Sequence, residues 1–174
     1  MNMTLEEALA GKESPQDIRQ NQALLDVEYW GFDDARHIGQ MVLHRDLKEE
    51  VREIFAEIFE ARFSIEKMMP VVAFGWSDDE SMAANNSSAF NYRVAVGKTR
   101  LSQHAYGRAI DINPVQNPYI KGELVLPPSA EYSPSVKGAL LPEGAVVTAF
   151  ETRGWTWGGR WTTLKDWHHF EKPE

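Results

Sequence analysis

Apolar spacing and end signals predict several helices along the chain. In "RDLKEEVREIFAEIFEARF" the apolar positions lie three or four residues apart, on one face of a helix: Leu47, Val51, Ile54, Phe55, Ile58 and Phe59. "GAVVTAFETRG" indicates a second helix that Gly154 closes. Ser77, followed by three acidic residues, predicts a capped helix start, and Thr4 and Gly11 frame a short helix near the N-terminus.

Other segments carry the residues and turn signals of strands. "LLDVEYWGF" and "HIGQMVLH", separated by "DDAR", predict a β-hairpin. "MPVVAFGW" is typical of a buried strand, and we expect "FNYRVAV" to be a strand before the turn "GKTR". "WTWGGRW" indicates a glycine-bent strand or loop. Because strands and helices do not alternate regularly, we predict an α+β fold, with helices packed on an antiparallel sheet.

Composition limits the classes of function. The 174 residues suit one domain. A formal net charge of −8 argues against a nucleic-acid surface, which needs clustered Lys and Arg. The chain has no cysteine, so His and carboxylates are its only strong metal ligands. We expect a monomer that binds no nucleic acid and has no membrane span.

The ends of the chain suggest a simple organisation. Residues 1–22 are expected to be a polar lead-in and residues 23–174 the functional domain. The first residues lack a basic start and an apolar stretch, and no window approaches the roughly 18 apolar residues of a membrane span. We therefore expect synthesis in the cytoplasm. A substrate outside the cell would then be reached by lysis or by a non-standard export route.

Potential catalytic side chains are densest in "RLSQHAYGRAIDINPVQNPY", residues 100–119. His104 and Asp111 are seven residues apart, and Gly107 favours a turn followed by a short strand. An aspartate on that strand can point back at a histidine before the turn. His plus carboxylate suits zinc, and a third protein ligand would leave one position open for water. The alternative is that both are ordinary solvated or capping groups.

The segment "DWHHFE" offers a third ligand and a base. Asp166 and His168 share a face if the segment is extended, whereas Asp166 and His169 share one if it turns. The residues alone do not choose between these arrangements. One buried structural histidine beside one exposed histidine explains the segment equally well.

Together, "SQHAYGRAIDINP" and "DWHHFE" resemble the zinc peptidases that act on bacterial cell-wall peptides. These include D-alanyl-D-alanine carboxypeptidases and dipeptidases, and the L-alanyl-D-glutamate endopeptidases of phage endolysins. The shared pattern is S-x-H-x-x-G-x-A-x-D-[IL], followed far downstream by a carboxylate, two residues and H-F. "FNYR" and "GWTWGGRW" extend the resemblance to roughly residues 27–171. It implies a hedgehog/DD-peptidase-like fold.

The resemblance also implies roles for individual residues. It makes three side chains the ligands of one Zn²⁺: His104, Asp111 and His169. It makes Asp166 the general base, matches Arg93 to an arginine that steadies the scissile carbonyl oxygen, and matches Ser102 to a position that lines the substrate cleft. His168 inherits no role. We expect the chain to turn between residues 166 and 169 and His168 to face away from the metal.

The resemblance favours hydrolysis of peptidoglycan stem peptides by metal-activated water. Asp rather than Glu as the base favours the endopeptidase over the carboxypeptidase. A different class is a catalytically silent zinc- or peptide-binding module of the same fold. A serine hydrolase built on Ser102 is disfavoured, because no Gly-x-Ser-x-Gly elbow is present. We expect the tryptophans at positions 155, 157, 161 and 167 to build the core and the cleft wall rather than a sugar platform.

Overall fold

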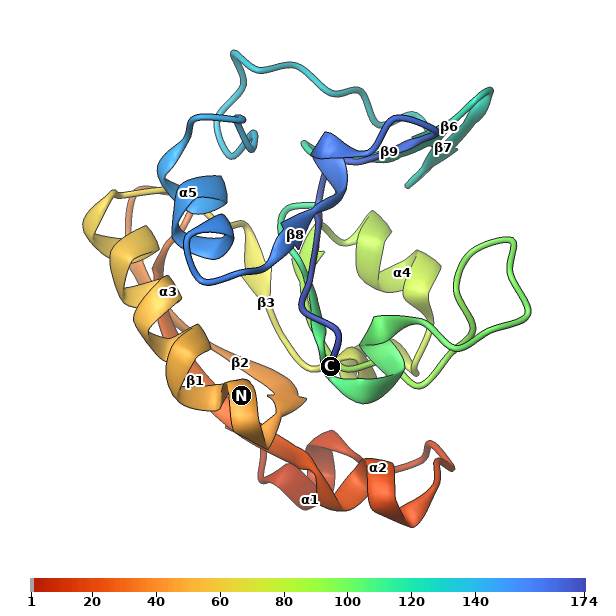
Figure 1. Ribbon diagram of the computed structural model, residues 1–174. Helices are drawn as coiled ribbons and strands as arrows, with labels where there is room; N and C mark the ends of the chain where they lie inside the picture. Colours follow the sequence, from red (N-terminus) through yellow and green to blue (C-terminus); the bar gives the residue numbers. More distant parts are fainter. Residues whose placement is uncertain (1) are drawn as a thin grey trace.

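The computed structural model describes residues 2–174 and has α+β architecture, which confirms the predicted fold class (Figure 1). The α-helices are α1 (Leu5–Ala8), α2 (Gln16–Gln20), α3 (Lys48–Glu60), α4 (Asp78–Ala83) and α5 (Ala145–Glu151). Short 3₁₀ helices are η1 (Arg45–Leu47), η2 (Val71–Phe74), η3 (Gln103–Tyr106) and η4 (Gly158–Arg160). The strands are β1 (Gln22–Trp30), β2 (Arg36–His44), β3 (Lys67–Met68), β4 (Asn86–Ser87), β5 (Ala109–Asp111), β6 (Tyr119–Lys121), β7 (Leu124–Leu126), β8 (Thr156–Trp157), β9 (Lys165–Asp166) and β10 (His169–Glu171).

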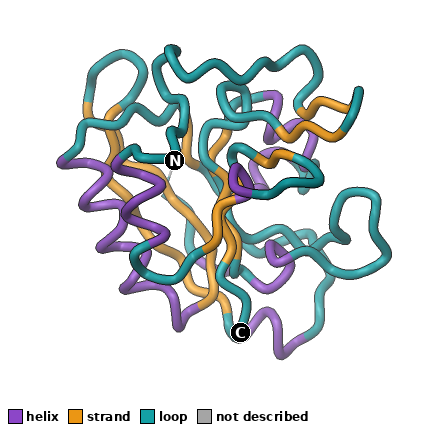
Figure 2. The backbone as a smooth tube through the Cα atoms, turned by 45° about the horizontal axis from the view of Figure 1, so that its top comes forward, coloured by secondary structure: helices purple, strands orange, loops and turns teal. Residues whose placement is uncertain are grey.

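The predicted hairpin and the predicted long helix are both confirmed. β1 and β2 pair antiparallel from Gln22 opposite His44 to Trp30 opposite Arg36. α3 lies along this hairpin and beside α5 (Figure 1, Figure 2). Its apolar stripe is buried, since that face meets the strands: Val51, Ile54, Phe55 and Ile58. With 13 residues α3 is the longest helix, and no helix in residues 2–174 has the length and apolarity to cross a membrane.

The strands form four small sheets rather than one large one. Their orders are β1-β2, β3-β4, β5-β10-β8 and β7-β6-β9, and every pair except the parallel β3-β4 is antiparallel. In the sheet β5-β10-β8, Phe170 stacks on Phe150 of α5 with ring centroids 4.2 Å apart. Trp157 of β8 is also fully buried there. This aromatic packing fixes the sheet against α5 and leaves its β5 and β10 ends beside a cleft.

The N-terminal segment packs against the hairpin. Thr4 caps α1 in a capping box with Glu7, and Gly11 follows the helix with a φ of +74°, so the predicted frame of this helix is confirmed. Ala8, Leu9 and Ile18 form a second apolar cluster with Val42 of β2 and with Phe90. α1 and α2 therefore cover apolar surface that the hairpin would otherwise expose.

Two further predictions about helix ends are confirmed. The Oγ atom of Ser77 accepts a hydrogen bond from the backbone N–H of Glu80 at 3.2 Å, which caps α4. Gly154 follows α5 with a φ of +81°, a value that a glycine adopts without strain.

The strand predicted in "MPVVAFGW" is wrong. After the two-residue strand β3, the chain enters the 3₁₀ helix η2 directly behind Pro70. Proline has no N–H for a sheet ladder, and its fixed φ suits the start of a helical turn. Gly75, with a φ of +59°, then ends the turn. Hydrophobicity predicted the burial of Met68 and Val71 but not the backbone conformation.

The strand predicted in "FNYRVAV" is also wrong. Val94 makes one isolated bridge to Leu101, and the rest of the segment has no ladder. Its backbone groups pair with separate parts of the fold: the N–H of Phe90 donates to Val42 and that of Asn91 donates to His104. The segment leads into a turn at residues 96–97, which overlaps the predicted turn "GKTR" only at Gly97.

Glu50 of α3 joins the helix to two distant parts of the chain. Its carboxylate accepts hydrogen bonds from the Trp155 Nε1 at 2.7 Å and from the Lys172 Nζ at 2.8 and 2.9 Å. Burial opposes ionisation of this carboxyl, but the bonds from Lys172 and Trp155 outweigh it and lower its pKa. The interaction therefore stabilises the fold above the ordinary pKa of glutamate and is lost as pH falls through the lowered value.

We predict that Glu50→Gln lowers the free energy of unfolding at pH 7 by about 1–2 kcal/mol, because charge-assisted hydrogen bonds are lost. Urea denaturation of the variant and the wild type measures this difference. The difference should shrink below about pH 4, where the wild-type carboxyl also becomes neutral. Glu49→Gln is the control, since Glu49 is exposed and its pairing with Arg52 contributes little. Equal losses for the two variants would contradict the role of Glu50.

Candidate metal centre and its cleft

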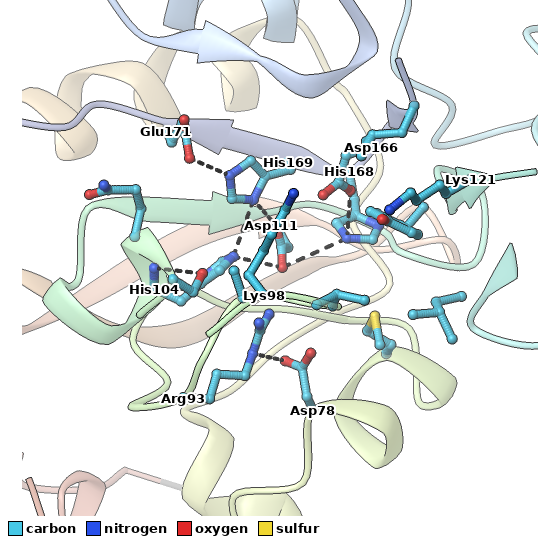
Figure 3. Close-up of a pocket in the computed structure, with 18 of the residues that line it drawn as sticks. Asp78, Arg93, Lys98, His104, Asp111, Lys121, Asp166, His168, His169 and Glu171 are labelled. Carbon is cyan, nitrogen blue, oxygen red and sulfur yellow. Dashed lines mark hydrogen bonds and ion pairs between the residues drawn. The ribbon is translucent and has the colours of Figure 1, made fainter. Parts of the chain in front are cut away.

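Three side chains from separate elements converge at one point (Figure 3). His104 lies on η3, Asp111 ends β5, and His169 begins β10. In the antiparallel pairing of β5 with β10, His169 is directly opposite Asp111. Side chains at directly opposite positions on one face of a sheet are nearest neighbours, so the register itself brings these two together.

The turn that presents His104 is tightly constrained. The Ser102 Oγ accepts a hydrogen bond from the backbone N–H of His104 at 3.3 Å and so caps η3. Gly107 ends η3 with a φ of +69°, and its carbonyl accepts from the N–H of His44 at 2.8 Å. A Cβ at this position would collide with the backbone of Leu43 and His44. Glycine is therefore required for the turn to dock on β2.

The hydrogen bonds of the two histidines leave one ring nitrogen of each directed at the same point. His104 Nδ1 lies 2.5 Å from the carbonyl oxygen of Ala89, which can only accept, so Nδ1 carries the proton and Nε2 is the inward nitrogen. His169 Nε2 lies 3.0 Å from the Glu171 carboxylate, which leaves Nδ1 facing inward. The two inward nitrogens are 3.2 Å apart, and each lies 3.0 Å from a different oxygen of Asp111.

This arrangement fits a zinc ion. Tetrahedral zinc with bonds of about 2.0–2.1 Å places its ligand atoms about 3.3 Å from one another, close to the spacing found here. Two imidazole nitrogens and one carboxylate oxygen are a donor set that zinc uses in catalytic sites. The outer nitrogens of both imidazoles are already engaged, as is usual for metal-bound histidines. His104, Asp111 and His169 can therefore hold a metal and still leave a position open.

The charges within the cluster depend on one another. Burial opposes ionisation of Asp111, yet neighbouring His104 and His168 hold the pKa of its carboxyl well below the usual range. Burial likewise disfavours a charged His169, but hydrogen bonds to Asp111 and Glu171 raise its pKa to about 10. In the metal-free protein, protons thus occupy the position that a cation would take.

The segment from residue 166 to 169 turns, as predicted. Lys165–Asp166 belongs to β9 and His169 begins β10, with a turn at 167 and 168 between them. The backbone N–H of Trp167 donates to Pro118 at 3.2 Å, and its carbonyl accepts from the Trp157 Nε1 at 2.9 Å. These bonds hold the turn from both sides, so Asp166 and His169 both remain on the cleft side.

The expectation that His168 faces away from the site is wrong. His168 is buried and lines the same cleft. Its Nε2 lies 3.0 Å from Asp166 Oδ1 and 3.9 Å from Asp111 Oδ2. Burial opposes a charge on its ring, but Asp166 and Asp111 raise its pKa to about 9. The family resemblance assigns no role to His168. In the structure, its ring lies between Asp166, the proposed base, and Asp111 of the cluster.

The position of Asp166 is set by a close backbone contact. Asp166 pairs with Tyr119 of β6, and Gly158 lies against its backbone carbonyl and Cβ, where a side chain on residue 158 would not fit. The second glycine of "WTWGGRW", Gly159, is packed as tightly against Trp157. Because these positions carry no side chain, the backbone of η4 can pack directly against the backbone of Asp166.

Arg93 and Ser102 also line the cleft. The Nε atom of Arg93 lies 2.9 Å from Asp78 Oδ1, and Asn91 donates to the same carboxylate oxygen at 3.3 Å. Asp78 at the start of α4 therefore holds the guanidinium beside the cluster (Figure 3). Arg108 lies outside this cleft and pairs with Glu174.

The cleft has an apolar wall and a cationic rim. Trp161 stands 5.5 Å from the His169 ring, with Leu164 and Leu126 nearby in the lining, whereas Trp155 and Trp157 are in the core. The expectation that tryptophans build core and cleft wall is confirmed. Exposed cations also line the cleft: Lys98, Arg100 and Lys121. They come from the loop before η3 and from β6, which project on the same side of the molecule (Figure 1, Figure 2).

The sequence pattern missed three residues that support the site: Asp78, Asn117 and Glu171. The strand period offered a signal for Glu171 alone, because it lies two residues after His169 and so shares its face. Asp78 was interpreted only as a helix-start residue. No local signal placed the carbonyl of Asn117 2.7 Å from the His168 ring.

Comparison with known proteins gives one match. A family model described as D-alanyl-D-alanine carboxypeptidase matches residues 95–172. That segment contains the three converging side chains, Asp166 and His168, while Arg93 precedes it. No significant match was found among curated proteins or solved structures. Over the segment that carries the site, the chain is thus similar to D-alanyl-D-alanine carboxypeptidases, a family of zinc enzymes, and this similarity supports a metallopeptidase.

Proposed function

We propose that this protein is a zinc-dependent peptidase that hydrolyses peptidoglycan stem peptides. The observation that carries the proposal is the buried group of His104, Asp111 and His169, whose donor atoms all lie within 4.8 Å of one another. Its position in a cleft beside a further carboxylate, Asp166, supports hydrolysis rather than metal storage. Two bonds are candidates. The Asp at position 166 favours the L-alanyl-D-glutamate bond, and the family match favours the D-alanyl-D-alanine bond.

His104, Asp111 and His169 would hold the zinc ion. Zinc bound there would polarise the peptide carbonyl and lower the pKa of water toward about 7. Asp166 accepts the proton of the attacking water and passes it to the leaving amine. Arg93, held at Nε by Asp78, donates hydrogen bonds to the oxyanion that develops on the scissile carbonyl. Ser102 keeps its hydroxyl proton free for substrate, since its oxygen accepts from His104.

The charges of the cleft support an acidic peptide as substrate. Lys98, Arg100 and Lys121 bring three exposed cations to the rim of an otherwise acidic protein with a net charge of −8. Stem peptides carry free carboxylates close to both candidate bonds. Cations at the rim would steer and orient such groups, at a strength that falls with salt. Trp161 and Leu164 offer apolar contact for alanine methyl groups.

The first prediction from the proposed function concerns the metal. The purified protein should hold one zinc per chain, and His169→Ala should weaken zinc binding by more than about 100-fold, since even outer-shell changes cost 10–100-fold. Competition with a chromophoric chelator measures the affinity. His37→Ala is the control, because His37 lies on the hairpin and pairs with Asp33. Equal zinc affinity in His169→Ala and the wild type would refute the ligand assignment.

The second prediction concerns the base. Asp166→Asn should retain one zinc and lose turnover by about 10²–10⁴-fold, the usual contribution of a general base. Asp79→Asn is the matched control, since it removes an exposed carboxylate that does not line the cleft. Metal analysis and mass spectrometry of products from purified muropeptides provide both measurements. If Asp166→Asn loses its zinc, Asp166 is a ligand and the proposed role is wrong.

The same products decide between the candidate functions. Release of terminal D-alanine identifies the carboxypeptidase, and cleavage after the first L-alanine identifies the endopeptidase. A zinc-loaded wild type that cuts neither bond would instead support a silent zinc- or peptide-binding module.

The third prediction concerns the rim. Lys98→Gln together with Lys121→Gln should raise KM for a stem peptide with free carboxylates by about two- to thirtyfold, since each exposed ion pair contributes roughly 0.2–1 kcal/mol. The effect should be smaller on the same peptide with amidated carboxylates and at high salt. Lys12→Gln together with Lys137→Gln removes the same net charge away from the cleft and serves as the control. An equal rise in KM for both double variants would exclude a local role.

A further inference from the structure

His168 is the buried group of the cleft for which the proposed mechanism has no use. Its side chain is 5% exposed, and both ring nitrogens face specific partners. We infer that His168 is a positioning residue that holds the carboxylate of Asp166 in place for proton transfer. This inference rests on the proposed role of Asp166 as the base. It assigns a function to a position where resemblance gives none.

The inner side of the ring is anchored to a rigid loop. His168 Nδ1 lies 2.7 Å from the main-chain carbonyl of Asn117. A carbonyl oxygen only accepts, so Nδ1 donates, and this bond sets the rotation of the ring. The side chain of Asn117 is itself fully buried. It donates to the carbonyls of Ile112, Asn113 and Gly138, and it accepts from the N–H of Leu140 at 2.7 Å.

The main chain of His168 is held as well. Its carbonyl accepts a hydrogen bond from the N–H of Ile112 at 3.0 Å, at the end of the β5-β10 pairing. Both the ring and the backbone of His168 are thus tied to the segment that follows Asp111. A displacement of His168 relative to the cluster would have to break one of these bonds.

The outer side of the ring meets only one oxygen of the base. His168 Nε2 lies 3.0 Å from Asp166 Oδ1 as an ion pair, and this oxygen is buried from solvent and accepts no hydrogen bond from another group of residues 2–174. The Asp166 side chain nevertheless retains 14% exposure, which therefore belongs to its other atoms. His168 thus occupies Oδ1 and leaves Oδ2 as the oxygen that can meet water in the cleft. A carboxylate fixed at one oxygen keeps the other in a defined direction.

The geometry argues against two other roles for His168. It is not part of the converging ligand group, and its Nε2 is 3.9 Å from the nearer oxygen of Asp111. A purely space-filling residue would not need a nitrogen facing a buried carboxylate. Phenylalanine would fill similar space without leaving a ring nitrogen to be desolvated.

The kinetic experiment compares His168→Phe with His168→Gln. Phenylalanine retains the bulk but has no donor, whereas the glutamine amide can still donate to Asp166. We expect His168→Phe to keep one zinc, to lower kcat by about 10–100-fold and to change KM by less than about twofold, because a misplaced base affects the reaction and not binding. His168→Gln should stay within about threefold of the wild-type kcat. Wild-type kcat in His168→Phe, or equal losses in both variants, would overturn the inference.

A second readout does not require activity. In the metal-free protein, His168→Phe should lower Tm by roughly 3–6 °C, because it leaves the buried carboxylate without its partner. In an Asp166→Asn background the same change should lower Tm by less than about 2 °C. Equal shifts in both backgrounds would show that the residues are not coupled and would overturn the inference. If the wild type cuts no stem peptide, the proposed function fails, while this cycle still decides whether His168 holds Asp166.

Discussion

The register between β5 and β10 is the constraint on which the rest of the site depends. It sets His169 opposite Asp111 and joins two segments that lie 58 residues apart in sequence. A slip of one residue would turn His169 to the other face of the sheet and put Phe170 in its place. Phe170 stacks on Phe150 in the core, so the aromatic packing and the site enforce the same register. Apolar packing, rather than contacts among His104, Asp111 and His169, thereby fixes the positions of these three candidate ligands.

The site also imposes a cost on this core. Removing charged groups from water is unfavourable by several kcal/mol per ion unless partners compensate. Each buried group has such a partner: His104 meets Ala89, His169 meets Glu171, and Asp111 lies between both rings. The supporting contacts come from the main chain of Ala89 or from Glu171, two positions further along the same strand. They engage the outer ring nitrogens and leave the inward nitrogens of both histidines directed at one point, which makes the cluster preorganised.

Sequence reasoning succeeded where the determining interactions are local. The stripe of α3, the caps at Thr4 and Ser77, and the β1-β2 hairpin all follow from spacing and turn chemistry. It failed for "MPVVAFGW", where Pro70 overrides the apolar run, and for "FNYRVAV", whose backbone bonds go to β2, to η3 and to residues 100–102 rather than to one neighbouring strand. The convergence of the site was expected from resemblance and not from the residues alone. One partner of His168, the carbonyl of Asn117, lies 51 residues away, and no local pattern encodes that distance.

The charge distribution is compatible with an acidic protein taking the acidic peptide proposed as its substrate. At physiological ionic strength a charge acts over about 8 Å, so the net charge of −8 has little influence inside the cleft. There Lys98, Arg100 and Lys121 lie at the rim, while the acidic side chains of the interior are paired with Arg93 or with histidines. A peptide carboxylate entering the cleft therefore encounters local cations before the buried carboxylates. The acidic remainder of the surface repels other copies of the chain and leaves this local attraction intact.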